Sequence, residues 1–243
     1  MSRIMKLAVA VAVLALIAGG ALWWFVIRND APPPAALPNR SAQTTAAGST
    51  GAGIASSSTT TADAGAVDGE WSVVTGTGVW VGYRVEETVG PNAVHGTAVG
   101  RTPGVEGSLS IADSKVTAVD ITADLTRLTS DEDRRDKRLH TGALATDTFP
   151  EATFSLTEPI ELGALPALGE KLPVKAKGEL TIHGVTKTVE LDLDTRWNGD
   201  SIDVAGKTVI RFDDYGIDNP SFAGMLSVED RGILELQLTF ERS

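Results

Sequence analysis

The side chains best suited to metal binding or proton transfer are three histidines, and they are scattered. His95, His140 and His183 lack the Glu-x-x-His or His-x-His spacing that places two ligands on one metal ion. The chain has no cysteine, which excludes disulfides, thiolate catalysis and cysteine-based zinc sites. We therefore expect no metal centre and no cofactor. We interpret His183 as a turn residue, His140 as a cation at a helix end and His95 as solvent-facing.

Two carboxylate clusters, Asp131-Glu132-Asp133 and Asp213-Asp214, have the groups needed for calcium binding or acid–base catalysis. Neither has the alternating oxygen ligands and turn glycine of a calcium loop, so a helix start and a solvated turn are the simpler interpretations. No serine lies in the Gly-x-Ser-x-Gly pattern that exposes a nucleophile. We expect that the chain is not an enzyme.

The charge of the chain argues against nucleic acid as a partner. Residues 69–243 contain 29 acidic and 17 basic side chains, and the whole chain has a net charge of −11. An acidic surface repels phosphates, which proteins bind through Lys and Arg. One basic cluster, Arg134-Arg135-Lys137-Arg138, has two interpretations: it contacts an anionic headgroup, or it complements the dipole of a helix from an exposed face.

Strands must position these residues, and the clearest pair meets in LTIHGVTKTVEL, Leu180 to Leu191. Apolar and polar residues alternate on both sides of His183-Gly184, which predicts a β-hairpin with glycine in its turn. The alternation continues upstream to Leu172 and downstream to Leu193. It indicates an antiparallel sheet with one apolar face.

Residues 69–243 contain eight or nine such strand patterns, separated by turn residues. They predict an all-β domain, a closed antiparallel barrel of about eight strands, because closure removes exposed strand edges. One short helix is expected after the fourth or fifth strand, over Ser130 to Ala145, with Ser130 as its N-cap. Its C-terminal end is expected to cover one mouth of the barrel through Leu139, Leu144 and Phe149.

The first 68 residues differ in composition. Residues 1–6 include basic side chains, which predicts a cytoplasmic N-terminus. Residues 7–27 form an uncharged run long enough to cross a hydrocarbon layer of roughly 30 Å, which predicts a transmembrane signal anchor. A cleaved signal peptide is the alternative. Residues 28–68 are rich in Ala, Ser, Thr, Pro and Gly, which predicts a disordered linker. The domain at 69–243 is then expected on the extracytoplasmic face of the cell membrane, attached by a single span.

Three segments resemble, in order, those of the YceI-like domain family: RRDKRLHTGALATDTFPEATF at 134–154, LTIHGVTKTVEL at 180–191 and IRFDDYGI at 210–217. The resemblance covers about residues 69–243. It implies a lipocalin-like barrel that holds a long polyisoprenoid or similar lipid. That family commonly has an arginine where this chain has Phe212, whereas here Arg211 stands one position earlier. Because side chains alternate along a strand, the shift predicts that this arginine points to the opposite face.

The inward-facing residues of the barrel are expected to line a tunnel. Small inward residues leave volume for it: Gly96, Ala98, Gly107, Ala176 and Gly178. The predicted lining is otherwise apolar or aromatic, and it consists of Val81, Tyr83, Val85, Leu109, Val119, Ile121, Leu139, Phe149, Phe154, Leu180, Ile182, Val189, Leu191, Phe212, Leu236 and Leu238.

These observations predict a membrane-tethered binding protein that sequesters or carries a long-chain polyisoprenoid, quinone-like or fatty ligand. Two alternatives stay open. The barrel is solidly packed and acts as an envelope interaction or stress module, or it is an enzyme that acts on the bound lipid through a polar pair such as Tyr83 and an inward acid. The sequence also leaves open whether the barrel forms a homodimer.

Overall fold

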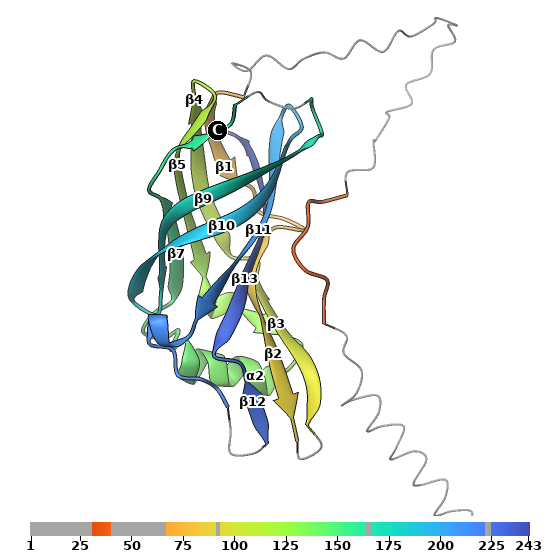
Figure 1. Cartoon of the computed structure of the whole chain (residues 1–243), viewed down its shortest axis with the longest axis vertical. Helices are drawn as coiled ribbons and strands as arrows, with labels where there is room; N and C mark the ends of the chain where they lie inside the picture. The colour runs from red at the N-terminus through yellow and green to blue at the C-terminus, as the bar shows by residue number, and fades with distance from the viewer. Residues whose placement is uncertain (1–30, 40–66, 91–92, 164–166, 222–224) are drawn as a thin grey trace, which may run out of the picture.

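The structure, a computed structural model, describes residues 31–39, 67–90, 93–163, 167–221 and 225–243 (Figure 1). The strands are β1 (Gly69–Val73), β2 (Trp80–Val89), β3 (Val94–Thr102), β4 (Val105–Ala112), β5 (Lys115–Asp124), β6 (Thr129–Ser130), β7 (Glu151–Leu156), β8 (Ile160–Glu161), β9 (Lys171–Ile182), β10 (Val185–Trp197), β11 (Ser201–Arg211), β12 (Leu226–Val228) and β13 (Arg231–Arg242). The helical segments are η3 (Leu125–Arg127), α2 (Asp133–Arg138), the π-helical turn η4 (Leu139–Ala143) and η5 (Asp213–Tyr215).

Eight of the strands close an antiparallel barrel. They are hydrogen-bonded in the order β1, β4, β5, β7, β9, β10, β11 and β13, and β13 pairs with β1 to complete the ring. Because each strand of the ring has a partner on both sides, the ring has no free edge strand. This arrangement confirms the prediction of a closed, lipocalin-like antiparallel barrel of about eight strands.

The sheet opens at one end, because β13 is shared by two partners. Its C-terminal residues pair with β1, whereas Ile233 to Gln237 pair with β2, which forms a hairpin with β3. On its other side β3 pairs with the two-residue strand β6. In Figure 1, α2 crosses the molecule at this end, beside the β2–β3 hairpin. At this end the barrel is therefore covered by a helix and side chains rather than by a continuous sheet. We call it the open end, because the sheet is open there, and we call the opposite end the closed end.

The β9–β10 hairpin has the register that its alternation predicts. Val185 pairs with Ile182, and the pairing continues without a shift along both strands. His183 and Gly184 form the two-residue turn, with φ angles of 51° and 74°. Left-handed φ angles at both positions are typical of the turns whose twist matches that of paired strands.

The core has two centres along the barrel axis. The first, at the end opposite α2, surrounds Trp71, which is fully buried and whose indole nitrogen donates a hydrogen bond to the carbonyl of Val67 at 3.0 Å. The second lies at the open end and includes Phe154, Leu180 and Tyr215. Trp71 and Phe240 are the aromatic residues buried in the first core, and Phe154, Phe212 and Tyr215 are those buried in the second.

The helix is shorter than predicted, and Ser130 is not its N-cap. α2 begins at Asp133, after the N-cap Glu132, whose carboxylate accepts a backbone amide of the first turn. Ser130 instead pairs with Gly100 of β3, and its amide and hydroxyl donate to Asp136 at 2.9 and 2.6 Å. Because the backbone of Ser130 belongs to the sheet, the helix starts only after it. The helix follows β5 and the two-residue β6, in agreement with its predicted place.

Residues 31–39 depart from the disordered linker predicted over 28–68. They form neither helix nor strand and run along the outside of the barrel, in red in Figure 1. Arg84, Arg101 and Arg196 of the barrel donate hydrogen bonds to carbonyls of this segment, which we call the strap. Composition did not predict the strap because its contacts involve backbone carbonyls rather than large apolar side chains.

The predicted membrane anchor, residues 7–27, lies outside the described residues. Among the residues that the structure does describe, no helix has the length and apolar character needed to cross a membrane. Membrane attachment therefore stays a prediction.

Candidate functional site

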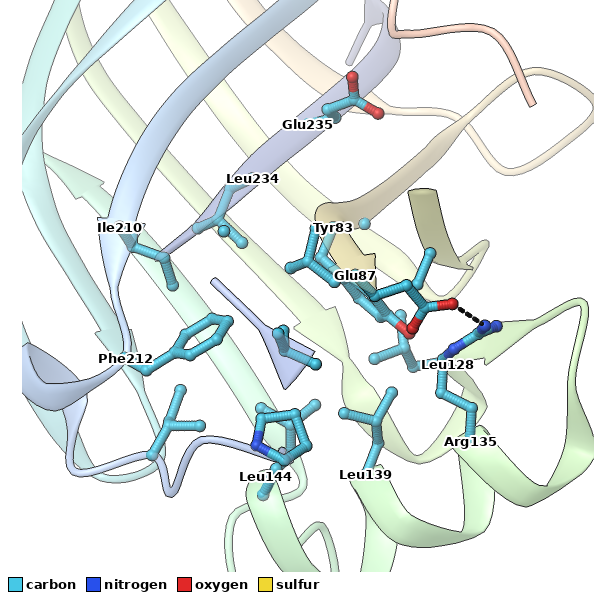
Figure 2. A pocket seen from close by; sticks show the side chains of 18 of the residues that line it. Tyr83, Glu87, Leu128, Arg135, Leu139, Leu144, Ile210, Phe212, Leu234 and Glu235 are labelled. Carbon is cyan, nitrogen blue, oxygen red and sulfur yellow. Dashed lines mark hydrogen bonds and ion pairs between the residues drawn. The ribbon is translucent and has the colours of Figure 1, made fainter. Parts of the chain in front are cut away.

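An apolar cavity of about 660 Å³ lies at the open end of the barrel (Figure 2). Ligand pockets typically measure about 300–1,000 Å³. Inward-facing residues of β2, β3, β5, β7, β9, β10, β11 and β13 form its wall, and Leu139 and Leu144 cover it from the helical segment. Protein cores contain few voids larger than a water molecule, so this volume is not ordinary packing.

Most of the predicted lining residues meet in this cavity. Period-two alternation places those on strands on one face, and closure of the barrel turns that face inward, whereas Leu139 comes from η4. Eleven of the sixteen border it: Val81, Tyr83, Val85, Ile121, Leu139, Phe154, Leu180, Ile182, Leu191, Phe212 and Leu236.

Four predicted lining residues face inward but do not border the cavity. Leu109 and Leu238 belong to the core at the closed end. Val119 packs between the two cores, and Val189 packs against the core at the open end. The prediction was wrong for these residues because alternation indicates which face of a strand is inside, but not how far along the barrel axis a residue lies.

Phe149, the fifth exception, covers the β9–β10 turn instead of the barrel mouth. Its ring contacts that of His183 edge-on, with centroids 4.6 Å apart, and a Cβ on Gly184 would come within 2.6 Å of it. The Nδ1 atom of His183 lies 3.3 Å from the carbonyl of Tyr215. The structure thus places His183 in a turn, as predicted, and shows that its partner is a carbonyl distant in sequence.

The small inward residues have two different roles. A Cβ on Gly178 would come within 2.4 Å of the Phe154 ring, and one on Gly100 within 2.3 Å of the Tyr83 ring, so at these positions aromatic rings fill the space. Gly96 and Ala98 instead border the cavity. Of the five small residues predicted to leave volume, the two on β3 do so.

Charged residues gather where α2 meets the β2–β3 hairpin. Arg135 contacts Glu87 at 3.1 Å and Asp131 at 2.5 Å, and the Arg135 and Glu87 side chains are only 22% and 13% exposed. Figure 2 shows this pair beside Tyr83. Burial disfavours the charged guanidinium, but the two carboxylates outweigh that effect and raise the pKa of Arg135. This ion pair joins the helix to the hairpin, so Arg135 has a structural role within the basic cluster.

Tyr83 places a buried hydroxyl beside this ion pair. Among the residues that the structure describes, its Oη atom has no hydrogen-bond partner. Burial raises the pKa of Tyr83 above its ordinary value of 10.0, and the attraction of Arg135 offsets only part of that rise. The phenol is therefore neutral at physiological pH and suited to donate a hydrogen bond to a ligand oxygen. An apolar wall with polar groups near its mouth fits an amphiphile with a long apolar chain and a small polar end.

Phe212 and Arg211 lie on opposite sides of the wall, as their one-residue shift predicts. Phe212 borders the cavity and is 9% exposed, whereas Arg211 is exposed on the outer surface. The interior is consequently more apolar at this position than the family pattern implies.

His140 is half-buried and hydrogen-bonded through both ring nitrogens. Its Nε2 donates to the carbonyl of Leu128 at 2.9 Å, and its Nδ1 is hydrogen-bonded to the hydroxyl of Thr146 at 3.0 Å. These bonds tie η4 to the chain on either side of the helix and hold the cover of the cavity in place. His95 is exposed, as expected.

Several lining residues were missed, for two reasons. Ile210 and Leu234 follow the strand alternation and could have been predicted from it. Leu125, Leu128 and Ile217 lie in turns, where no periodicity indicates which side chains face inward. Glu87 was also missed, because its partner Arg135 is 48 positions away in the chain. Glu235, at the edge of Figure 2, points away from Leu234 and belongs to the outer face of β13.

Comparisons with known proteins agree with this architecture. A UPF0312 protein of Vibrio campbellii and one of Vibrio parahaemolyticus are each 33% identical to this chain over 115 residues, which is 44% of this chain and 56% of theirs. The match thus spans about half the length of these relatives. A polyisoprenoid binding domain from Saccharophagus degradans, described as implicated in plant cell wall breakdown, superimposes with a TM-score of 0.57 at 19% identity, covering 71% of this chain and 98% of that domain. At this identity the likeness concerns the fold.

The family model of the YceI-like domain matches residues 55–240. This range contains strands β1 to β12, β13 as far as Phe240, and every strand residue that borders the cavity. The chain therefore belongs to the YceI-like domain family.

Proposed function

We propose that this chain is a binding protein that encloses a long-chain lipid, of the polyisoprenoid, quinone-like or fatty class, without acting on it as an enzyme. The observation that carries the proposal is the apolar cavity of about 660 Å³ between the barrel wall and its helical cover. Burial of about 300 Å² of an apolar chain contributes about 7 kcal/mol before entropy losses. That gain comes from the wall alone and requires no charged partner.

The isoprenoid class is supported by the Saccharophagus degradans domain, which is described as binding polyisoprenoids and shares the fold. The polar end of such a ligand would lie near Tyr83, because that residue borders the same cavity and its buried hydroxyl has no hydrogen-bond partner among the described residues. A neutral phenol favours a hydroxyl or carbonyl oxygen over a cation.

The proposal includes a membrane tether. The uncharged run at 7–27, preceded by Arg3 and Lys6, supports a single span with the barrel on the extracytoplasmic face. A tether keeps the cavity at a high effective concentration near the bilayer from which an insoluble ligand must come.

The test is to purify residues 28–243, which keep everything that the structure describes, from a lipid-containing host without detergent. Organic extraction and mass spectrometry should then find a long-chain lipid in near-stoichiometric amount. Protein that is empty, and that also fails to take up geranylgeraniol or a menaquinone, would contradict the proposal and favour the interaction module.

A further inference from the structure

The strap, residues 31–39, is held on the outer wall by three arginines that each bind one backbone carbonyl. Arg84 donates to Pro32 at 2.7 Å and Arg101 donates to Pro33 at 2.5 Å. Arg196 donates to Pro38. The bonds lie at both ends of the strap, so the whole segment is fixed along the wall (Figure 1).

Arg84 and Arg196, which bind the two ends of the strap, are themselves oriented by buried carboxylates of the barrel. Arg84 contacts Glu235 at 3.2 Å, and Arg196 contacts Asp203 at 2.9 Å. Glu235 is only 2% exposed and Asp203 is fully buried, although both belong to the outward-facing phase of their strands. Each guanidinium is thus held by a barrel carboxylate, and its Nη2 atom donates both to that carboxylate and to a strap carbonyl.

Arg101 is oriented in a different way. Its guanidinium stacks on the ring of Trp80, 3.7 Å from the ring centroid. Beside it, a Cβ on Gly82 would come within 2.2 Å of the carbonyl of Gly100 and 3.1 Å of Arg101, so the glycine leaves room for the Arg101 side chain. Pro34 and Ala35 line a pocket on the same wall together with Ala205.

The composition of the strap, APPPAALPN, suits this surface. Prolines favour an extended backbone before binding, so little conformational entropy is lost on docking. Proline has no N–H and cannot add a strand to the sheet, which leaves its carbonyls available to side-chain donors. The three arginines therefore bind an extended, proline-rich segment through its carbonyls.

Docking changes the length of chain between the predicted membrane span and the barrel. A free linker of 41 residues, 28–68, has a root-mean-square span of roughly 35 Å. Only five residue steps separate Ile27 from Pro32, a reach of at most about 17 Å. Docking thus holds the part of the barrel wall that binds Pro32 close to the end of the predicted membrane span.

The direction of the strap decides which end of the barrel is held there. Pro32 and Pro33 contact β2 and β3, and the strap then runs away from α2, so that residue 31 is nearer the open end (Figure 1). At that end Val89 and Met225 are 39% and 63% exposed, and the carbonyl of Met225 accepts the amide of Gly90 at 2.8 Å. Two neighbouring apolar side chains thus lie where a bilayer would be met.

We propose that the docked strap converts the linker into a short leash that turns the open end of the cavity toward the bilayer. The proposal rests on the membrane tether proposed above. The partner of this end is a lipid surface, and the leash sets the path by which an apolar ligand passes between bilayer and cavity.

Docking itself is tested in solution, independently of any membrane. The chain has no native cysteine, so spin labels are introduced at Ala36→Cys on the strap and Val209→Cys on the exposed face of β11. We expect one narrow distance distribution by pulsed electron resonance in residues 28–243. A broad distribution would overturn the proposal, whatever ligand the cavity binds.

Orientation is tested with the full chain in vesicles of phosphatidylethanolamine and phosphatidylglycerol. A fluorophore is attached at Met225→Cys on the open end or at Asp200→Cys in the β10–β11 turn at the opposite end, and lipid-borne quenchers are added. We expect strong quenching at position 225 and little at position 200. Equal quenching at both would overturn the proposed orientation, and failure of the chain to float with the vesicles would refute the tether and with it the leash.

Two insertions provide matched variants that change no residue of the barrel. A flexible Gly/Ser insert of about 20 residues between positions 30 and 31 lengthens the leash, and should remove the difference between the two labels. The same insert between positions 50 and 51 lies after the strap and should leave the difference unchanged. If both inserts act alike, the strap does not restrain the barrel and the proposal is wrong. Affinity for geranylgeraniol in solution, measured on residues 28–243 with and without each insert, should be unaffected by either insert while the proposed function holds.

Discussion

Gly96→Leu should block ligand binding without weakening the fold. Gly96 borders the cavity from β3, and a Cβ added there would meet only Glu87, with its Cγ at 3.8 Å and its Oε1 at 3.9 Å, which is ordinary contact. The backbone at Gly96 is not in the left-handed region, so leucine adds no strain. Leu180, by contrast, already packs in the core at the open end. Gly96 is therefore the better position for a blocking substitution.

The size of the effect follows from the volume that leucine takes from the ligand. Its four-carbon side chain displaces about four methylene groups, each worth about 0.8 kcal/mol when buried, or about 3 kcal/mol in all. Affinity should fall by roughly a hundredfold. The stability of the domain should be unchanged or slightly raised, because glycine inside a strand is unfavourable.

The assay is displacement of a fluorescent alkyl probe by geranylgeraniol, with the unfolding midpoint in urea measured on the same samples. Thr188→Leu is the matched control, because it adds a similar side chain on the exposed face of β10. It should leave affinity unchanged. A folded Gly96→Leu variant with wild-type affinity for geranylgeraniol would show that the ligand is not bound in this cavity.

The remaining predictions concern the polar end of the cavity and the closed-end core. Tyr83→Phe should weaken binding of geranylgeraniol about threefold to tenfold, the value of one hydrogen bond, but not that of the hydrocarbon squalene, in the same displacement assay. Burial raises the pKa of both tyrosines, Tyr83 and Tyr215. Their contribution to stability is thus complete below about pH 10 and lost as pH rises through the folded values. In an ultraviolet pH titration, tyrosinate should appear well above pH 10 in the folded protein, and ionisation near pH 10 without unfolding would contradict their burial. Leu109→Ala or Leu238→Ala should destabilise the domain by about 2–5 kcal/mol in urea unfolding. Neither should change affinity for geranylgeraniol, because both residues lie outside the cavity.

Sequence alone determined the features that depend on local rules. Alternation around His183-Gly184 predicted the hairpin, its register and its inward face, because side chains of a strand point alternately to its two sides. The one-residue shift between Arg211 and Phe212 correctly placed the arginine outside for the same reason. The closed barrel followed from the number of half-buried strands and the need to pair their edges.

Tertiary structure alone decided what depends on contacts between distant segments. The depth of Leu109 along the barrel axis, the pairing of Glu87 with Arg135, and the binding of strap carbonyls by Arg84 all join residues far apart in the chain. Periodicity indicates the face of the strand from which a side chain projects, but it does not indicate how far along the barrel axis the residue lies. Composition, likewise, predicts order only from the content of apolar side chains. It therefore cannot predict that a segment such as the strap is held through its backbone carbonyls. The cavity, its polar mouth and the strap therefore became visible only when the chain was closed into its fold.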